Sequence, residues 1–365
     1  MSKFLQAPNP IIPGTKKDSI YVFLAGPIQG VHDWQKNDVP DLGDGVTVLS
    51  PRRETIDKST FNWDEQVKWE TEALRVSDYV LFWIPPEEEK IEGRDYAQTT
   101  KIELMENLAR GKRIILGIHP TIHTRRYLVH KAEKYRLANT GLYAVHETLE
   151  DCIKELKERL KSDLETTDPS VNTFFTSDTH FGSGRALELS VRPFKGVEEM
   201  DWTMIERWNQ VVRPNSTVHH LGDFGNFDIL KYLNGNVYLT LGNYERKEIS
   251  EQFGGNVEEY VSMLMSKGFV GVNVDPSIID IHTSFEDSQK IAIGHEPVAT
   301  NRLRQESNVK YALFGHIHGR QKIKPFGIDV GVDCNNFTPC RASKEVRFFL
   351  NALDKGYYDE EVWIQ

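Results

Sequence analysis

Short apolar runs alternate with polar stretches of helical periodicity along the chain, and this alternation predicts an α/β protein. In the front half, apolar runs of five or six residues are typical of buried strands, and the intervening stretches place apolar residues at helical spacing. In chain order these segments are 20–24, 64–76, 79–84, 98–110, 113–118 and 147–161. Strands that alternate with helices favour a mostly parallel sheet covered on both faces.

Five apolar runs in the back half each lead into a short turn that carries a side chain able to bind metal. The runs are 174–177, 217–221, 237–241, 290–293 and 311–314. The polar residues that follow them are Asp178, His180, Asp223, Asn243, His295, His316 and His318. Because strand ends within one sheet lie side by side, we expect these side chains to converge in one crevice.

The length of 365 residues favours two domains over one. Residues 162–171 are polar and without periodicity, so we expect a linker between a first domain at 19–161 and a second at 172–365. Residues 1–18 are expected to be a flexible N-terminal arm.

Composition limits the classes of function. Hydrophobic residues make up 39% and charged residues 27%, as in ordinary globular proteins. The net charge of −10 argues against strong duplex DNA binding, which depends on neutralising phosphates. Three scattered cysteines favour free thiols in a reducing compartment. The start does not resemble a signal peptide and no apolar run could span a bilayer, so we expect a cytoplasmic protein without membrane contact.

The back-half residues suit a pair of divalent ions. Carboxylates can bridge two cations, neutral imidazole suits Mn, Fe, Ni or Zn, and an amide oxygen adds a weak neutral ligand. Mn²⁺ is the expected ion, with Fe, Ni, Zn or Mg as alternatives. Two such ions clamp a phosphate and lower the pKa of a shared water. Asp223 lies between the other ligands in chain order and is the expected bridge.

In their order and spacing, these motifs resemble those of the calcineurin-like metallophosphoesterases over about residues 172–345, and most closely the small phosphoesterases of bacteria and phages. The resemblance implies an αββα sandwich of two sheets flanked by helices. It further implies one ion held by Asp178, His180, Asp223 and His318, and another held by Asp223, Asn243, His295 and His316.

One position departs from the family pattern. Tyr244 stands where the family usually has a histidine that contacts the scissile phosphate and assists the leaving group. A phenol can donate a hydrogen bond but is a poor proton shuttle at neutral pH. Tyr244 remains a candidate catalytic residue, and His219 and His220 are candidate substitutes for the missing histidine, although their run favours a core position for at least one.

Two carboxylates of the front half, Glu70 and Glu103, come from neighbouring strand–helix units. Such a pair can divide the work of glycosidic cleavage, one attacking or stabilising C1′ and the other handling protons or the sugar. A charged residue on an amphipathic helix is more often solvated, so this pairing needs the context of the surrounding motifs.

Those motifs resemble the nucleoside 2-deoxyribosyltransferase family and its nucleotide N-hydrolase relatives over about residues 19–160. The matching segments are 23–28, 33–34, 51–53, 66–70, 77–78 and 102–104. The resemblance implies a flavodoxin-like doubly wound sheet, with Glu103 as the nucleophile and Glu70 against the sugar. It implies substrate contacts at Gly26, Pro27, Asp33, Trp34 and Asp78, and a homo-oligomer, since relatives often complete their sites with a neighbouring subunit.

Two sets of side chains stay open at this stage. Trp34, Trp63 and Trp69 are candidates for stacking on a base, although Trp69 fits a core position better. The arginine pairs at 52–53 and 125–126 are candidates for binding a 5′-phosphate, or are solvated surface.

The sequence therefore predicts a bifunctional nucleotide-processing enzyme. Its first domain would cleave or exchange the N-glycosidic bond of a nucleoside or nucleotide, and its second would hydrolyse a phosphate ester with two metal ions. One alternative is a metal-dependent nuclease or cyclic-nucleotide phosphodiesterase whose first domain only binds a nucleotide. Another is a nucleotide sensor without turnover.

Overall fold

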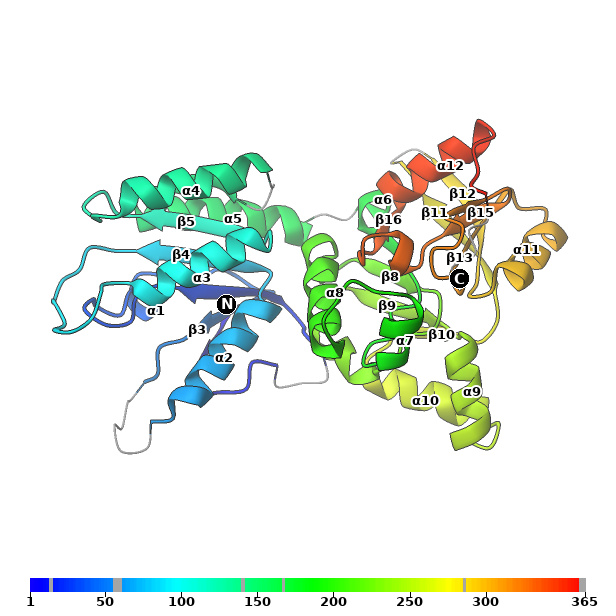
Figure 1. The fold of residues 1–365 in the computed structure, drawn as a ribbon, viewed down its shortest axis with the longest axis horizontal. Helices are drawn as coiled ribbons and strands as arrows, with labels where there is room; N and C mark the ends of the chain where they lie inside the picture. Colours follow the sequence, from blue (N-terminus) through cyan, green and yellow to red (C-terminus); the bar gives the residue numbers. More distant parts are fainter. Residues whose placement is uncertain (13–15, 55–60, 139–141, 166–167, 285–286, 361–365) are drawn as a thin grey trace. The chain divides into compact units, whose positions relative to one another are not determined.

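The computed structural model describes residues 1–12, 16–54, 61–138, 142–165, 168–284 and 287–360 (Figure 1). The chain divides into two compact units. The first contains Met1–Pro13 and Asp18–Glu165, and the second contains Gly14–Lys17 and Thr166–Gln365. No described helix has the length and apolar character needed to cross a bilayer.

The first unit is built on one six-stranded sheet in which all strands run parallel. Its elements are β1 (Lys3–Gln6), β2 (Ile20–Ala25), α1 (Trp34–Asn37), β3 (Val46–Ser50), α2 (Trp63–Val76), β4 (Tyr79–Ile84), α3 (Gln98–Ala109), β5 (Ile114–Ile118), α4 (Arg125–Ala138), β6 (Leu142–His146) and α5 (Leu149–Glu165). The strand order is β1-β3-β2-β4-β5-β6. This mixed α/β arrangement is consistent with the expected flavodoxin-like domain.

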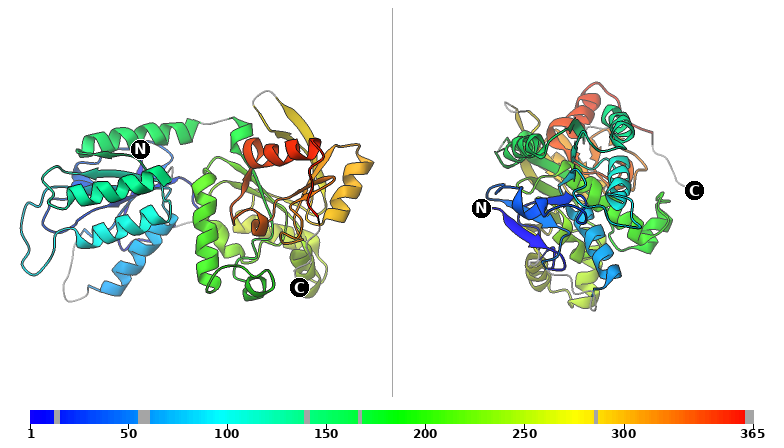
Figure 2. Two further views of the ribbon diagram at one scale, coloured as in Figure 1. Left: turned by 45° about the horizontal axis from the view of Figure 1, so that its top comes forward. Right: turned by 90° about the vertical axis from the view of Figure 1, so that its left-hand side faces the viewer.

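Helices cover both faces of this sheet, because alternate residues of each buried strand point to opposite sides. Trp34 of α1 and Leu156 of α5 join a core with Leu24 and Leu81 on one face. On the other face the Trp69 ring of α2 lies 6.4 Å from the Phe23 ring. Helices α3 and α4 pack against each other, as both Figure 1 and Figure 2 show.

The structure differs in two details from the expected boundaries. Residues 3–6 are not part of a flexible arm, since they form β1 and pair in parallel register with residues 47–50 of β3. The division between the units, at Glu165 and Thr166, falls within the expected linker at 162–171, but most of the described residues there are helical. Helix α5 continues to Glu165, and α6 (Pro169–Asn172) begins after Asp168, whose side chain accepts a hydrogen bond from Ser170 N–H.

The second unit contains two five-stranded sheets. After α6 its elements are β7 (Thr173–Thr176), α7 (Gly184–Leu189), α8 (Val197–Val211), β8 (Thr217–His220), η1 (Phe227–Tyr232), β9 (Asn236–Thr240), α9 (Asn243–Gln252), α10 (Val257–Lys267), β10 (Gly271–Asn273), β11 (Ser277–His282), β12 (Ser288–Ile293), α11 (Pro297–Glu306), β13 (Tyr311–Phe314), β14 (Ile323–Lys324), β15 (Gly327–Asp329), η2 (Val332–Cys334), β16 (Cys340–Arg341), η3 (Ala342–Val346) and α12 (Arg347–Asp354). The sheet orders are β10-β9-β8-β7-β16 and β11-β12-β13-β15-β14.

The two sheets share one hydrophobic core. Phe175 of β7 and Leu221, which follows β8, pack there with Ile291 and Ile293 of β12 and with Leu313 of β13. This arrangement corrects the one-sheet argument for the metal ligands. Strands β7, β8 and β9 belong to one sheet and β12 and β13 to the other. The ligand-bearing turns are therefore brought together by the packing of two sheets as well as by strand pairing.

Candidate active site and candidate metal centre

A cavity of about 480 Å³ lies beyond the carboxyl ends of β2 and β4 in the first unit. The strand order reverses between these two neighbours, and such a switch point is where ligands bind in open parallel sheets. The volume is within the range of small-molecule sites. The polar side chains of its described lining are Gln29, Gln66, Glu70, Glu87, Arg94, Asp95, Tyr96, Gln98, Thr99, Thr100 and Glu103.

Glu103 of α3 and Glu70 of α2 both line this cavity. Burial, together with the negative charges of Glu70 and Glu106, raises the pKa of Glu103 to about 8. Burial also raises the pKa of Glu70, although a hydrogen bond from Gln66 and the charge of Arg53 oppose that shift. A buried carboxyl group whose ionisation is further opposed by a neighbouring carboxylate is typical of catalytic sites.

Glu70 is held in place by a chain of hydrogen bonds that starts at Arg53. The Arg53 Nε–H donates to Gln66 Oε1 at 2.7 Å. The Gln66 amide nitrogen in turn donates to Glu70 Oε1 at 2.8 Å and to the Pro51 carbonyl at 2.7 Å. Arg53 therefore acts on the carboxylate through the buried Gln66 amide and does not line the cavity itself.

The segment between β4 and α3 supplies much of the cavity wall, including Asp95, which the sequence reasoning missed. The segment is anchored at several points. Tyr96 Oη donates to the Pro85 carbonyl at 2.8 Å, and Glu88 Oε1 lies 2.6 Å from His32 Nδ1. Arg94 donates to Gln29 Oε1. The only sequence signal for Asp95 was the acidic character of this loop.

Gly26 and Pro27, two of the predicted substrate contacts, line the cavity. Only glycine fits sterically at position 26. A Cβ there would lie 2.4 Å from the Trp83 carbonyl oxygen and 2.7 Å from the Trp34 ring. Trp63 also lines the cavity, whereas Trp69 is buried and donates from Nε1 to the Asn9 carbonyl at 2.7 Å.

Three predicted substrate contacts do not line the cavity, and the structure gives each another role. Trp34 is fully buried in the core beneath Gly26. Asp78 precedes β4, at the opposite end of the strand from the cavity, and accepts a hydrogen bond from Tyr21 N–H at 2.7 Å. Asp33 caps α1 and lies 3.4 Å from Arg52 Nε. These three residues therefore lie outside the lining of this cavity.

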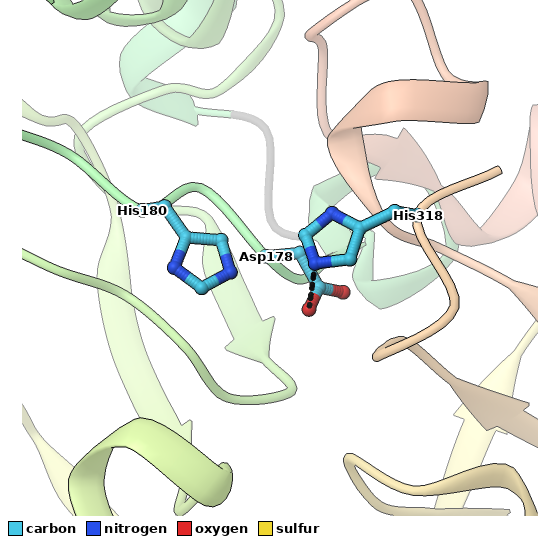
Figure 3. A group of neighbouring side chains, drawn as sticks. All are labelled: Asp178, His180 and His318. Carbon is cyan, nitrogen blue, oxygen red and sulfur yellow. Dashed lines mark ion pairs between the residues drawn. The ribbon is translucent and has the colours of Figure 1, made fainter. Parts of the chain in front are cut away.

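In the second unit, the seven predicted metal ligands lie in one cluster. Asp178, His180 and His318 form one group whose ligand atoms lie within 4.8 Å of one another (Figure 3). The closest oxygen–nitrogen approach between Asp178 and His318 is 3.9 Å, from Oδ1 to Nε2. Asp223 Oδ2 lies 3.5 Å from His180 Nε2.

A second group joins Asp178, Asp223 and His295. Asp223 Oδ2 lies 3.4 Å from His295 Nε2, so the same carboxylate oxygen faces a histidine of each group. Asn243 Oδ1 lies 2.7 Å from His295 Nε2 and 3.0 Å from His316 Nδ1. This placement of Asp223 is the one required of a bridging ligand.

Buried polar atoms that lack hydrogen-bond partners indicate whether these residues could hold a cation. Asp178 Oδ1 and His180 Nε2 are buried without a hydrogen-bond partner among the described residues. Orphaned buried polar atoms are costly, and a metal ion would satisfy both. His295 Nδ1 lies 2.8 Å from the Leu221 carbonyl, which can only accept, so this nitrogen donates and Nε2 faces the cluster. The donor set therefore fits divalent metal.

The backbone of the ligand-bearing turns is strained. Asp178, His180, Asp223, His316 and His318 all have positive φ, between 48° and 72°. Non-glycine residues rarely adopt this region, and such strain is concentrated at functional sites. Gly315 permits the close approach, since a Cβ there would lie 2.3 Å from Asp178 Oδ2.

Asp333, which supports the cluster, escaped the sequence reasoning. Asp333 Oδ2 lies 2.8 Å from His318 Nδ1 and accepts a hydrogen bond from it. This contact directs Nε2 of His318 toward Asp178. The buried Arg192 guanidinium donates to Asp333 and to the carbonyls of Asp178 and Thr179, at 2.6–3.0 Å. Asp333 lies outside the ligand motifs, so only the fold reveals this contact.

Tyr244 lies at the rim of the cluster, 44% exposed, with its ring edge-on to His180 at 4.8 Å. The two candidate substitutes for the missing histidine are occupied elsewhere. His220 is fully buried, and its Nε2 lies 3.0 Å from Thr179 Oγ1. The ring of His219 is stacked between Phe175 and Tyr238 at 5.3 and 5.5 Å. Burial lowers the pKa of His219 to about 4 and that of His220 to about 3, so both are neutral packing groups.

Comparison with known proteins identifies the class of the first unit. Residues 19–121 match the family described as "Nucleoside 2-deoxyribosyltransferase like". The chain therefore contains a nucleoside 2-deoxyribosyltransferase-like domain, which confirms this part of the resemblance. The match suggests enzymatic activity on nucleosides, and a small nucleoside substrate is consistent with it.

Two similar proteins and one solved structure complete the comparison. "Uncharacterized protein MJ1445" of Methanocaldococcus jannaschii is 36% identical over 81 residues, covering 20% of this chain and 46% of that protein. "Gene 66 protein" of Mycobacterium phage L5 is 36% identical over 83 residues, covering 20% of this chain and 40% of that protein. The chain thus spans less than half the length of these relatives.

The solved structure is that of the protein of unknown function AQ665 from Aquifex aeolicus. It has a TM-score of 0.35 and 21% identity, covering 46% of this chain and 94% of that one. The metallophosphoesterase resemblance of the second unit stays a prediction.

Proposed function

We propose that the first unit cleaves or exchanges the N-glycosidic bond of an unphosphorylated nucleoside, with Glu103 as the nucleophile. The observation that carries this proposal is the pair of carboxyl groups, Glu70 and Glu103, in one cavity of suitable volume at the switch point of the sheet. The family match over residues 19–121 supports the nucleoside class.

The chemistry requires one ionised and one protonated group. A Glu103 oxygen forms a bond to C1′ while the C1′–N bond breaks, and the base departs with the bonding electrons and takes up a proton. Water or a second base then attacks C1′ and releases Glu103. Because burial and the negative charge of Glu70 oppose ionisation of Glu103, Glu103 retains its proton into the neutral range, and both of its forms are available there. Glu70, held by Gln66, is placed to handle the sugar or that proton.

The charge of the cavity favours a nucleoside over its 5′-phosphate. Among the described lining residues, Glu70, Glu87, Asp95 and Glu103 are acidic and Arg94 alone is basic. The Arg94 guanidinium already donates to the Gln29 side chain. A phosphate dianion would meet repulsion in such surroundings.

The test is incubation of the full chain with nucleosides and their 5′-monophosphates, with products separated by mass. We expect free base from nucleosides, and kcat/KM at least about tenfold lower for the monophosphates because of the like charge. Glu103→Gln should lower base release on the order of 10³-fold or more. Glu158→Gln, an exposed glutamate of α5 outside the lining, is the matched control and should retain activity. Base release that is unaffected by Glu103→Gln contradicts the proposal.

We infer that the second unit binds two divalent ions, with Mn²⁺ as the expected species, and hydrolyses phosphate esters. The observation that carries this second function is the convergence of seven ligands around buried atoms that lack hydrogen-bond partners. Bound ions would hold the phosphate and lower the pKa of a water molecule. Asp178, His180 and His318 would hold one ion, Asn243, His295 and His316 the other, and Asp223 would bridge them. Tyr244 lies at the rim, where its hydroxyl can donate a hydrogen bond to the phosphate.

Metal uptake by the full chain, measured calorimetrically with Mn²⁺, tests this function directly. Asp223→Asn should abolish binding of at least one ion. Asp333→Asn should weaken affinity about 10–100-fold, because it removes only the orientation of His318. Asp280→Asn, an exposed carboxylate of β11, is the control and should change nothing. A chain that takes up no transition metal overturns the inference.

Turnover of mono- and diester substrates then separates the alternatives. Release of p-nitrophenol from bis-p-nitrophenyl phosphate but not from the monoester favours the nuclease or phosphodiesterase alternative. Metal uptake without turnover of either ester favours a sensor.

A further inference from the structure

The outer face of α4 carries basic side chains that remain unneutralised on an acidic protein. Residues 119–138 contain five Lys or Arg and one Glu, while the whole chain has a net charge of −10. Two of those cations are paired at the edges of the helix, since Arg125 contacts Glu147 at 2.7 Å and Arg136 contacts Glu133 at 2.5 Å. The other three, Arg126, Lys131 and Lys134, give this helix its unneutralised positive charge.

Arg126, His130 and Lys134 are exposed and have no ion pair with any residue in the described part of the chain. Their spacing of four residues places them about 6 Å apart along one side of the helix. Tyr127 and Lys131 lie beside this row, with the Lys131 ammonium 5.4 Å from the Tyr127 ring centre. We define the basic face of α4 by these five residues.

An apolar groove adjoins the basic face. A cavity of about 420 Å³ lies between α3 and α4, with Ile102, Met105 and Leu128 among its lining residues and Tyr127 on the shared border. Ile102 is 56% and Tyr127 63% exposed. Large apolar side chains that are this exposed beside unpaired cations indicate a surface with a partner.

We propose that the basic face of α4 and its groove bind single-stranded nucleic acid. The cations Arg126 and Lys134 can follow a phosphate backbone, and an exposed aromatic ring with an apolar recess beside it stacks unpaired bases. This combination fits a single strand better than a duplex, whose bases are not free to stack on Tyr127. It fits a nucleic acid better than a membrane, because the exposed apolar residues lie in a groove and not on a protruding edge.

The surface is separate from the nucleoside cavity: α3 contributes to both, but the two linings share no residue. It is also independent of the proposed metal centre. The proposal therefore stands or fails without the proposed catalytic functions.

Fluorescence anisotropy with the full chain tests the proposal. The probe is a labelled oligothymidylate of about 12 nucleotides, in EDTA and at about 50 mM salt. We expect saturable binding that weakens as salt rises. Arg126→Glu with Lys134→Glu should weaken binding at least about tenfold and flatten the salt dependence. Tyr127→Ala should weaken binding about fivefold or more while leaving the salt dependence unchanged.

The matched control is Lys154→Glu with Lys157→Glu on the exposed side of α5, which changes the net charge of the protein by the same amount. It should bind the probe as the unaltered chain does. All variants should keep the far-UV spectrum and the thermal unfolding midpoint of the parent. The proposal is overturned by absence of binding at low salt, by equal loss in the α4 and α5 variants, or by equal affinity for a duplex. Binding to phosphatidylserine vesicles without binding to the oligonucleotide also overturns it.

Discussion

At the scale of single residues, carboxyl groups of this protein differ sharply in their environments. Glu103 is desolvated next to another acid, which raises its pKa to about 8. Burial raises the pKa of Asp329 to about 6, with the charge of Asp178 adding to the effect. Burial opposes ionisation of Asp333 as well, but hydrogen bonds from His318 and Arg192 outweigh it and lower its pKa. The first environment suits chemistry, and the last suits a permanent anion that orients a ligand.

The pKa of Glu103 leads to a prediction for pH dependence. A nucleophile must be ionised, so kcat/KM for base release should rise with pH between the ordinary glutamate value and about 8. Glu70→Gln removes a like charge, lowers the pKa of Glu103 and should move this rise to lower pH. The measurement is a pH–rate profile of both proteins on one nucleoside. An unchanged midpoint in the variant would show that the Glu70 charge does not act on Glu103.

The same pKa shift predicts a stability trend. The folded protein keeps a proton on Glu103 that the unfolded chain releases near its ordinary pKa, so this group's contribution to stability is lost as pH rises toward 8. Glu103→Gln should therefore become more stabilising, relative to the parent, as pH increases from about 5 to 8. Urea denaturation across this range measures the difference, and a difference independent of pH would contradict the shift.

At the scale of elements, each proposed metal ligand depends on a turn that follows a strand or opens a helix. Glu245, in the first turn of α9, connects two of these turns through hydrogen bonds. Its carboxylate accepts hydrogen bonds from the backbone N–H groups of Asp223, Phe224 and Gly242 at 2.8–2.9 Å. The bridge candidate Asp223 and the helix start at Asn243 are thereby held at a fixed separation.

Removal of these hydrogen bonds should damage both folding and metal binding. Glu245→Ala leaves three buried N–H groups without their acceptor, and we expect a loss of about 3 kcal/mol or more in the free energy of unfolding. Mn²⁺ affinity should fall with it, since Asp223 and Asn243 lose their common support. Denaturation and calorimetry measure the two effects, with the exposed Glu251→Ala of the same helix as the control. Normal Mn²⁺ affinity in a destabilised Glu245→Ala variant would show that these hydrogen bonds support folding but not the metal site.

At the scale of the whole molecule, the chain contains two units with separate cores. The segment before β2 is divided between the units: Lys16 and Lys17 belong to the second unit, although β2 itself belongs to the first. Lys17 N–H donates to the Lys231 carbonyl at 3.1 Å, and Lys16 Nζ donates to the Gly235 carbonyl. A cut at residue 165 therefore removes a support of the second unit while leaving the first sheet complete.

Separate expression of residues 1–165 and 166–365 tests this division. The first fragment should unfold cooperatively and retain nucleoside activity, because all six strands of its sheet are present. The second should bind Mn²⁺ but melt a few degrees lower than in the full chain, through loss of two hydrogen bonds worth about 1 kcal/mol each. Thermal unfolding and calorimetry give both results. An aggregated or inactive first fragment would show that the units depend on each other.

The amino-acid sequence alone determined the strands and helices with strong apolar periodicity, because burial dictates their pattern. It also indicated the metal-ligand candidates, since polar side chains directly after apolar runs are conspicuous, whereas Glu103 and Glu70 were singled out by the family resemblance of the motifs around them. Weakly patterned elements such as β1, β3 and α4 were missed, because their identity depends on pairing partners distant in the chain.

Only the tertiary structure decided which of these side chains meet. It placed Trp34 and Asp78 away from the cavity, added Asp95 to its wall, and joined ligands from two sheets where one was expected. It also revealed Asp333 and Glu245 as supports, and the unpaired cations of α4 beside an apolar groove. Such contacts depend on the three-dimensional separation of atoms, which local patterns of polarity do not encode.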